Sequence, residues 1–391
     1  EWAVFAMVAN RALAPDSKLG MVEWVDKDVA LGNDTPIALQ HLYRAMDLLL
    51  ENDELVQKEV FFSTATLLNL EVDLLFFDTT STYFERDEED EEEGALIRFG
   101  KSKDKRDDLP QIVIGLAVTK EGIPVRCWVL PGNTADTSTV DMVQRDLAGW
   151  KMSRCVWVMD RGMAGEENRT ILQRAGGHYI LGEKLRDKQE ANQAALSHPG
   201  RYKKVRENIE IKEIVVGEGE RRRRFVLVFN PEEAKKDRAT REKNLEKIRA
   251  ALEAMGDPQM RGHKKAACAL LSHRTHGRYL RESGDGKITI DKGKVRAEER
   301  LDGKYLLSTS DDSLSPEDVA LGYKQLLQVE RAFRTLKTTL ELRPVHHRKV
   351  DRIRSHVLLC WLALHLVRVA ERETGETWDT IRAIMDRIHL G

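Results

Sequence analysis

The stretch Val72-Asp73-Leu74-Leu75-Phe76-Phe77-Asp78 marks the point where the character of the chain changes. Before it, residues 1–70 carry apolar side chains at helical spacing and are predicted to be helical. Within it, the apolar residues are consecutive and the run is short. This pattern favours a buried β-strand that ends at Asp78.

Further segments after Asp78 are predicted to build a mixed sheet flanked by helices. Apolar runs at 111–118 and 124–130 are separated by the turn Gly122-Ile123-Pro124, and a helix is expected over 138–149. Residues 155–159 form another apolar run, which ends at Asp160. The resulting order is three strands, a helix and a strand, which is typical of an α/β fold.

Charge density rises after residue 183, and this change predicts an inserted subdomain. Strands are expected at 209–216 and 223–229, a charged helix at about 231–255, and a return to a core strand at 304–309. We therefore predict four segments: a helical N-terminal region (1–70), the first part of a core (71–182), an insertion (183–300) and the rest of the core (301–391).

The composition bounds the class of protein. The 391 residues include 63 Lys and Arg against 65 Asp and Glu, so any basic surface must be local. The four cysteines (Cys127, Cys155, Cys268 and Cys360) lie far apart, and no two of them have the C-x-x-C spacing of a zinc site. We therefore expect neither a zinc site nor a disulfide framework, as in a protein of the reducing cytosol.

The most apolar stretch, 357–370, contains His365 and Arg368 and is too short to span a bilayer, so we expect a buried helix and no membrane. The chain begins at Glu1 within an apolar helical pattern, without Met, and is expected to be a fragment; no signal peptide is visible.

Asp78 and Asp160 are the first two candidate site residues, because each is predicted to end a buried strand. One such aspartate is well explained as a cap of the following turn. Two of them, both fixed at the edge of a core, favour a cation site.

Glu330 is the third candidate. Ser315, Pro316 and Asp318 predict the start of a long helix whose apolar stripe runs to Leu340. Glu330 lies on the flank of that stripe. Tyr323 and Lys337 lie seven residues to either side, and Arg334 is one turn further on. The alternative interpretation of Glu330 is an ion pair with Arg334.

Three carboxylates on two strands and one helix suit hard divalent cations such as Mg²⁺. Two such ions can clamp the attacking and leaving oxygens of a phosphodiester. Between residues 319 and 354, nine Lys or Arg stand against three Asp or Glu, which gives a local basic patch for the DNA backbone.

These residues resemble the DDE insertion-sequence transposases, whose Tyr–Arg–Glu–Lys signature places Arg three, Glu seven and Lys fourteen residues after Tyr. Tyr323, Glu330 and Lys337 match, whereas Leu326 stands at the Arg position, so Arg331 and Arg334 are the alternatives for that phosphate contact. The other matching segments are Phe77-Asp78-Thr79-Thr80-Ser81, Gly100-Lys101-Ser102-Lys103-Asp104, Pro131-Gly132-Asn133-Thr134-Ala135-Asp136 and Asp160-Arg161-Gly162-Met163.

The resemblance implies a ribonuclease H-like catalytic core, in two parts (71–182 and 301–391), with an inserted β-rich subdomain and flanking helices. It also implies that the helical region 1–70 binds DNA. It implies catalysis and metal binding by Asp78, Asp160 and Glu330 with two Mg²⁺ ions, for which Mn²⁺ is an acceptable substitute. The DNA contacts expected with it involve Tyr323, Lys337, Arg334, Arg331, Lys103 and Arg106.

The implied substrates are the terminal inverted repeats of a mobile element and a target DNA, bound by a homodimer in a prokaryotic, nucleoid-associated cytoplasmic setting. Two alternatives stay open: a ribonuclease H-like nuclease without strand transfer, and an inactive DNA-binding descendant.

Two further groups have open interpretations. His346 and His347 are expected to contact the DNA backbone or to form plain surface, without binding metal. Residues 221–224 are four arginines that either contact phosphate or belong to a solvated hairpin.

Overall fold

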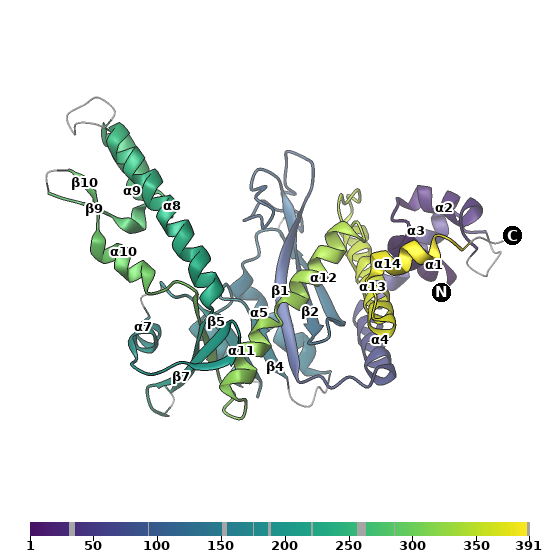
Figure 1. Cartoon of the computed structure of the whole chain (residues 1–391). Coiled ribbons are helices and arrows are strands. Elements are labelled where there is room, and N and C mark those ends of the chain that lie inside the picture. Colours follow the sequence, from purple (N-terminus) through teal and green to yellow (C-terminus); the bar gives the residue numbers. More distant parts are fainter. Residues whose placement is uncertain are drawn as a thin grey trace. The chain divides into compact units, whose positions relative to one another are not determined.

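The computed structural model describes residues 1–30, 36–92, 94–150, 155–174, 176–186, 189–219, 222–255, 263–284 and 286–388. The chain divides into two compact units (Figure 1). Unit 1 comprises residues 1–181 and 321–391, and unit 2 comprises residues 182–320.

Unit 1 contains the sheet that the sequence predicts around Asp78 and Asp160. The described strands run in the order β3-β2-β1-β4-β5. The first three pair antiparallel, whereas β1 pairs parallel with β4, and β4 with β5. Their bounds are β1 (Leu74–Tyr83), β2 (Gln111–Thr119), β3 (Pro124–Pro131), β4 (Val156–Met159) and β5 (His178–Glu183). The mixed α/β fold is therefore confirmed, and its strand order agrees with a ribonuclease H-like core.

One boundary in this sheet differs from the prediction. Asp78 was expected to end its strand, but β1 continues to Tyr83. The polar run Thr79-Thr80-Ser81-Thr82 is buried and pairs with β2 as far as Tyr83 opposite Gln111. Threonine has high β propensity, so the end of apolar sequence did not mark the end of the strand.

Helices cover both faces of this sheet (Figure 1). Leu75 and Phe77 of β1 pack in a core with Val140, Val143 and Leu147 of α5. Helix α12 packs on β1 and β2. The helices of unit 1 are α1 (Trp2–Leu13), α2 (Lys18–Lys27), α3 (Leu39–Glu51), α4 (Asp53–Leu67), α5 (Thr139–Ala148), α6 (Glu166–Arg174), α12 (Leu327–Thr338), α13 (Val350–Thr374) and α14 (Trp378–Met385), with the short η1 (Asp136–Ser138).

The long helix predicted from Pro316 is wrong in one respect, because two helices occupy the segment. Helix α11 (Pro316–Lys324) ends at Lys324, and a tight turn at Gln325 and Leu326 leads into α12. The start is as predicted: the Ser315 hydroxyl accepts a hydrogen bond from the Asp318 backbone N–H at 3.0 Å. The apolar spacing runs through the break without interruption, so the sequence pattern could not reveal it.

Unit 2 contains the strand order β11-β8-β7-β6 and a separate hairpin. Predicted segments 209–216, 223–229, 231–255 and 304–309 coincide with β7, β8, α8 and β11. The bounds are α7 (Glu190–Ser197), β6 (Lys203–Arg206), β7 (Ile209–Val216), β8 (Arg223–Phe229), α8 (Pro231–Met255), α9 (His263–Ser272), η3 (Gly277–Tyr279), β9 (Leu280–Glu282), β10 (Ile288–Ile290), α10 (Lys292–Glu299) and β11 (Lys304–Thr309). Whether residues 183–300 act as one inserted functional domain stays a prediction.

Helix α13 is the buried apolar helix expected from residues 357–370. It is long and apolar enough to cross a membrane by length and composition, but 67% of its most apolar window is buried inside the protein. It packs against α1, α3 and β3, as a core helix does.

Burial of His365 on α13 makes stability depend on pH. The His365 ring nitrogen lies 2.7 Å from the Thr64 hydroxyl, and burial lowers its pKa from 6.5 to about 4. The unfolded chain therefore takes up a proton between pH 6.5 and 4 that the folded chain does not. The contribution of His365 to the free energy of unfolding is therefore fully present above pH 6.5 and is lost as the pH falls toward 4.

We expect the free energy of unfolding to fall by up to about 3 kcal/mol for His365 alone across this window. Urea unfolding at pH 7 and pH 4.5 measures the loss. His365→Gln should show a smaller loss than the parent protein, whereas the exposed control His346→Gln should match the parent. Equal losses in all three proteins would refute the assignment to His365.

Candidate active site

Asp78 and Asp160 are brought together by the pairing of β1 with β4. Phe77 stands opposite Met159 at the end of this parallel ladder, and Asp78 and Asp160 are the residues that follow the pair. Neighbouring strands lie about 4.8 Å apart, and residues at equal register project to the same face. Phe77 and Met159 face the α5 side of the sheet, so both carboxylates project from the opposite face.

The segment around Tyr323 covers the same face. A side chain at Gly322 would contact Leu74 of β1 and Ile180 of β5, so the backbone lies close against these strands. From there the Tyr323 hydroxyl donates a hydrogen bond to Asp160 Oδ1 at 3.1 Å. The signature tyrosine therefore binds the second strand carboxylate directly.

Asp78 has a built-in cationic neighbour. Lys103 Nζ lies 3.3 Å from Asp78 Oδ1 and also donates to the Thr79 carbonyl at 2.7 Å and to Thr79 Oγ1 at 2.8 Å. Burial raises the pKa of the Asp78 carboxyl, and the Lys103 ammonium opposes that rise. The site thus holds a desolvated carboxylate that is stabilised by positive charge.

Asp136 completes this group and was not among the predicted site residues. Its Oδ1 accepts a hydrogen bond from the Thr79 hydroxyl at 2.5 Å, and its Oδ2 lies 3.5 Å from Lys103 Nζ. A side chain at Gly162, in the turn after Asp160, would lie 3.4 Å from Asp136 Oδ2. The matching segment that ends at Asp136 was a signal in the sequence, although no strand pattern pointed to it.

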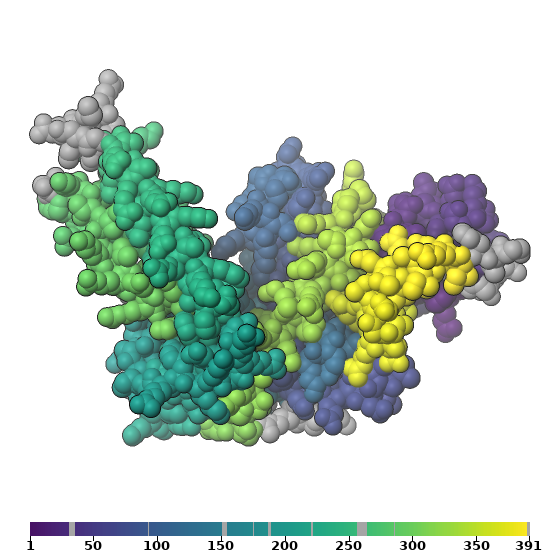
Figure 2. Space-filling view, in the orientation of Figure 1, coloured from purple at the N-terminus to yellow at the C-terminus, as the bar shows by residue number. Residues whose placement is uncertain are grey.

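Glu330 lies on α12, which packs on β1, but its side chain is exposed (Figure 2 shows α12 in yellow-green at the surface). Within the part of the chain that the structure describes, Glu330 forms no ion pair with Arg334. Among the same residues, no three His, Cys, Asp or Glu side chains form a ready metal cage. The structure therefore places Asp78 and Asp160 directly after paired residues of neighbouring strands, and Glu330 on a helix that packs on β1.

Lys337 is held two turns beyond Glu330. Its Nζ lies 2.9 Å from Asp104 Oδ2, and Arg343 contacts the same oxygen at 2.8 Å. Asp104 follows Lys103 directly, so the loop that reaches Asp78 also fixes the far end of α12. Glu330 lies midway between the two residues of its segment that are tied to this site, Tyr323 and Lys337.

The remaining residues that were predicted to contact DNA differ in how far their side chains are already engaged within the protein. Arg331 and Arg334 are exposed on α12 and form no ion pair with any residue that the structure describes. Arg106 makes two hydrogen bonds of 2.9 Å to Asp108, and its guanidinium lies 5.1 Å from the Tyr83 ring. Leu326, at the signature Arg position, is buried at the turn between α11 and α12.

Two glycines let the loops of Lys103 and Asp136 cross. A Cβ at Gly100 would lie 2.0 Å from the Gly132 carbonyl oxygen, and a Cβ at Gly132 would lie 2.0 Å from the Gln111 carbonyl oxygen. Gln111 also donates its side-chain amide to the Gly132 carbonyl at 2.9 Å. Only glycine fits at these positions, which lie three residues before Lys103 and four before Asp136.

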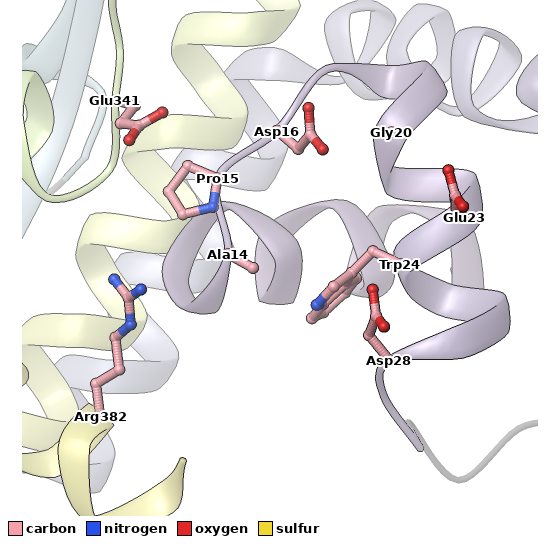
Figure 3. Close-up of a pocket in the computed structure, with 9 residues that line it drawn as sticks. All are labelled: Ala14, Pro15, Asp16, Gly20, Glu23, Trp24, Asp28, Glu341 and Arg382. Atoms are coloured by element: carbon pink, nitrogen blue, oxygen red, sulfur yellow. The ribbon is translucent and has the colours of Figure 1, made fainter.

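The cavities of unit 1 that lie outside this group include the following two. One of about 810 Å³ is lined by Tyr83, Arg343, His347 and Arg348, among others. The other, of about 360 Å³, is acidic (Figure 3): Asp16, Glu23, Asp28 and Glu341 line it, and Arg382 stands at its side. The acidic lining has the wrong charge for a DNA backbone.

The residues with open interpretations fall on ordinary surface or in ion pairs. His346 is exposed, and burial lowers the pKa of the neighbouring His347 to about 4, which keeps it neutral at pH 7. Arg222 pairs with Asp312, and Arg224 pairs with Glu213 at 2.6 Å, which favours the solvated hairpin. Arg221 lies outside the described residues.

Gly132→Ala tests the loop crossing. The added methyl group meets two backbone carbonyl oxygens that cannot move without disturbing β2. We expect a loss of about 1–3 kcal/mol of stability, measured by chemical denaturation. Gly149→Ala is the matched control, because a Cβ there meets nothing within 4 Å. Equal stabilities of the two variants would contradict the crossing.

The chain matches one family model over most of its length and is distantly similar to solved structures. Residues 73–366 match the family described as "Transposase DDE domain". No curated protein matches the chain in sequence. Among solved structures, the piggyBac transposase synaptic complex with hairpin DNA is 10% identical with a TM-score of 0.43, over 98% of this chain and 69% of that chain. The Mos1 transposase paired-end complex with the left transposon end is 14% identical with a TM-score of 0.19, over 46% of this chain and 51% of that chain.

Proposed function

The chain belongs to the transposase DDE domain family, and we propose that Asp78, Asp160 and Glu330 are the three carboxylates with which it cuts and rejoins DNA. Membership makes the protein a DNA transposase that depends on a divalent metal. The observation that supports the residue assignment is the pairing of Phe77 with Met159 on adjacent parallel strands, because Asp78 and Asp160 are the residues that follow this pair. Glu330 is assigned from the family signature and from its place between Tyr323 and Lys337.

The donor set fits Mg²⁺, with Mn²⁺ as a substitute. Mg²⁺ takes oxygen ligands and usually combines one or two carboxylates with water and substrate phosphate. Asp78 and Asp160 supply one such pair, and Glu330 with Asp78 or the DNA would complete a second site. When bound, two ions would activate the attacking oxygen and stabilise the leaving oxygen of an in-line displacement.

The proposed reaction consists of two displacements in one site. Water first attacks the phosphodiester at the element end and leaves a 3′-hydroxyl. That hydroxyl then attacks a phosphodiester of the target and displaces the 3′-oxygen of the target strand, so no covalent link between protein and DNA is needed. The Tyr323 hydroxyl donates a hydrogen bond to Asp160 and so orients that carboxylate. In the proposed complex, Tyr323 stands beside the cleaved strand.

Arg331 and Arg334 are proposed to bind the DNA backbone in place of the signature arginine. Both guanidinium groups are exposed on the helix that carries Glu330. Arginine forms two parallel hydrogen bonds to a phosphate, so such contacts fix the strand as well as attract it. Lys337 and Arg106 would add to this contact by exchanging their carboxylate partners for phosphate, while Lys103 has its donors occupied within the protein.

The proposed partners are the terminal inverted repeats of a mobile element and a target duplex, bound by a homodimer in the cytoplasm of a prokaryote. The two successive displacements require both DNAs at one site. A nuclease without strand transfer is the second candidate function. It predicts cleaved ends that are never joined to a target, so an assay for joining of labelled ends to plasmid DNA separates the two.

Asp78→Asn, Asp160→Asn and Glu330→Gln each remove one negative ligand and keep its shape. We expect cleavage of element ends in Mg²⁺ to fall by about a thousandfold or more, while DNA binding largely survives. Glu373→Gln, on the exposed surface of α13, is the control and should cleave normally. Unimpaired cleavage by Asp160→Asn would overturn the assignment.

Arg331→Ala and Arg334→Ala should each weaken DNA binding and reduce the slope of log K against log salt by about 1. Lys337→Ala should weaken binding and leave partial activity. Binding of labelled DNA at several salt concentrations measures both effects. Arg145→Ala is the control, because α5 lies on the opposite face of the sheet. An unchanged salt slope in both arginine variants would exclude them as phosphate contacts.

A further inference from the structure

We propose that Lys103 is a built-in counter-cation of Asp78 and that Asp136 is the positioning residue onto which it moves when a divalent metal binds. The proposal rests on the proposed function, in which Asp78 holds that metal. It assigns to Lys103 a role inside the protein, in place of the DNA contact expected from the sequence.

The contacts of Lys103 are internal and complete. An ammonium group has three hydrogen-bond donors. Here the Thr79 carbonyl, Thr79 Oγ1 and Asp78 Oδ1 accept them at 2.7, 2.8 and 3.3 Å. The Lys103 side chain is 38% exposed, so water reaches the group although no donor is left over for a phosphate.

Asp136 stands ready as a second acceptor. Its Oδ2 lies 3.5 Å from Lys103 Nζ, almost the same distance as Asp78 Oδ1. Its other oxygen is fixed by the Thr79 hydroxyl. A small movement of the ammonium therefore exchanges one carboxylate for the other while both contacts to Thr79 are kept.

The backbone holds this arrangement in place. Gly100 and Gly132 allow the two loops to cross without room for a Cβ. The Lys103 backbone N–H donates to Ser81 Oγ at 2.9 Å, which anchors the loop to β1. Lys337 and Arg343 fix the next residue, Asp104.

Charge explains what the arrangement does. Without metal, the ammonium balances the half-buried Asp78 carboxylate and also lies 3.5 Å from Asp136 Oδ2. A divalent ion at Asp78 repels an ammonium a few ångströms away, so the ion must displace it. Metal binding in the absence of DNA is therefore weakened by Lys103 and assisted by Asp136.

Titration of the purified full chain with Mn²⁺ tests the proposal, with free Mn²⁺ measured by electron paramagnetic resonance and no DNA present. Lys103→Met should raise Mn²⁺ affinity roughly tenfold, the size expected when one nearby like charge is removed. Lys103→Arg keeps the charge and should stay near the parent affinity. Lys101→Met, an exposed lysine in the same loop, is the matched control and should bind as the parent does.

A double-mutant cycle separates the roles of the two carboxylates. Asp136→Asn should lower Mn²⁺ affinity in the parent and have little effect in the Lys103→Met background. An equal loss in both backgrounds would make Asp136 a direct ligand and overturn its positioning role. Unchanged affinity in Lys103→Met would overturn the counter-cation.

Asp78→Asn separates failure of this proposal from failure of the proposed function. If Asp78→Asn binds Mn²⁺ as the parent does, the metal site itself is misplaced. If it loses Mn²⁺ while Lys103→Met and the parent bind equally, only the counter-cation fails. Thermal unfolding of each variant establishes that it is folded before titration. If Lys103→Met is unfolded, Lys103→Gln replaces it in the titration and in the cycle, because glutamine also removes the charge and keeps a hydrogen-bond donor.

Discussion

The parallel pairing of β1 with β4 is the constraint on which the candidate site depends. It pairs Phe77 with Met159, so Asp78 and Asp160 follow directly on a paired position of two neighbouring strands. Burial of Phe77 and Met159 on the α5 side fixes which face the two carboxylates share. A shift of one residue in this ladder would send one of them to the opposite face.

The helical part of the site is fixed through these same strands. Tyr323 binds Asp160, and Lys337 binds Asp104, whose neighbour Lys103 reaches Asp78. Each end of the segment around Glu330 is thus tied to one of the two strand carboxylates. The geometry explains why a signature spread over fifteen residues can act as one unit despite the break at Leu326.

Sequence patterns predicted the elements whose apolar and charged residues separate cleanly. The strands β7, β8 and β11 and the charged helix α8 coincide with their predicted ranges. Prediction failed where side chains suit more than one structure. The threonines after Asp78 continue the strand, and the apolar spacing through Leu326 conceals a turn. The contacts of Lys103 and Asp136 were also hidden, because they depend on a backbone crossing between loops that are 33 residues apart in the sequence.

Asp104 has a wider consequence for how this protein discriminates among DNA sites. One carboxylate holds two cations, Lys337 and Arg343, within 3 Å on the surface that carries Glu330. While Asp104 neutralises Lys337 and Arg343, these two cations attract DNA only weakly. Non-specific binding of DNA to this surface is therefore weakened. A strand that is fully seated can take over the two cations from Asp104. In the function proposed above, this exchange would favour correctly positioned DNA over DNA that is merely nearby, in a protein whose net charge is −2.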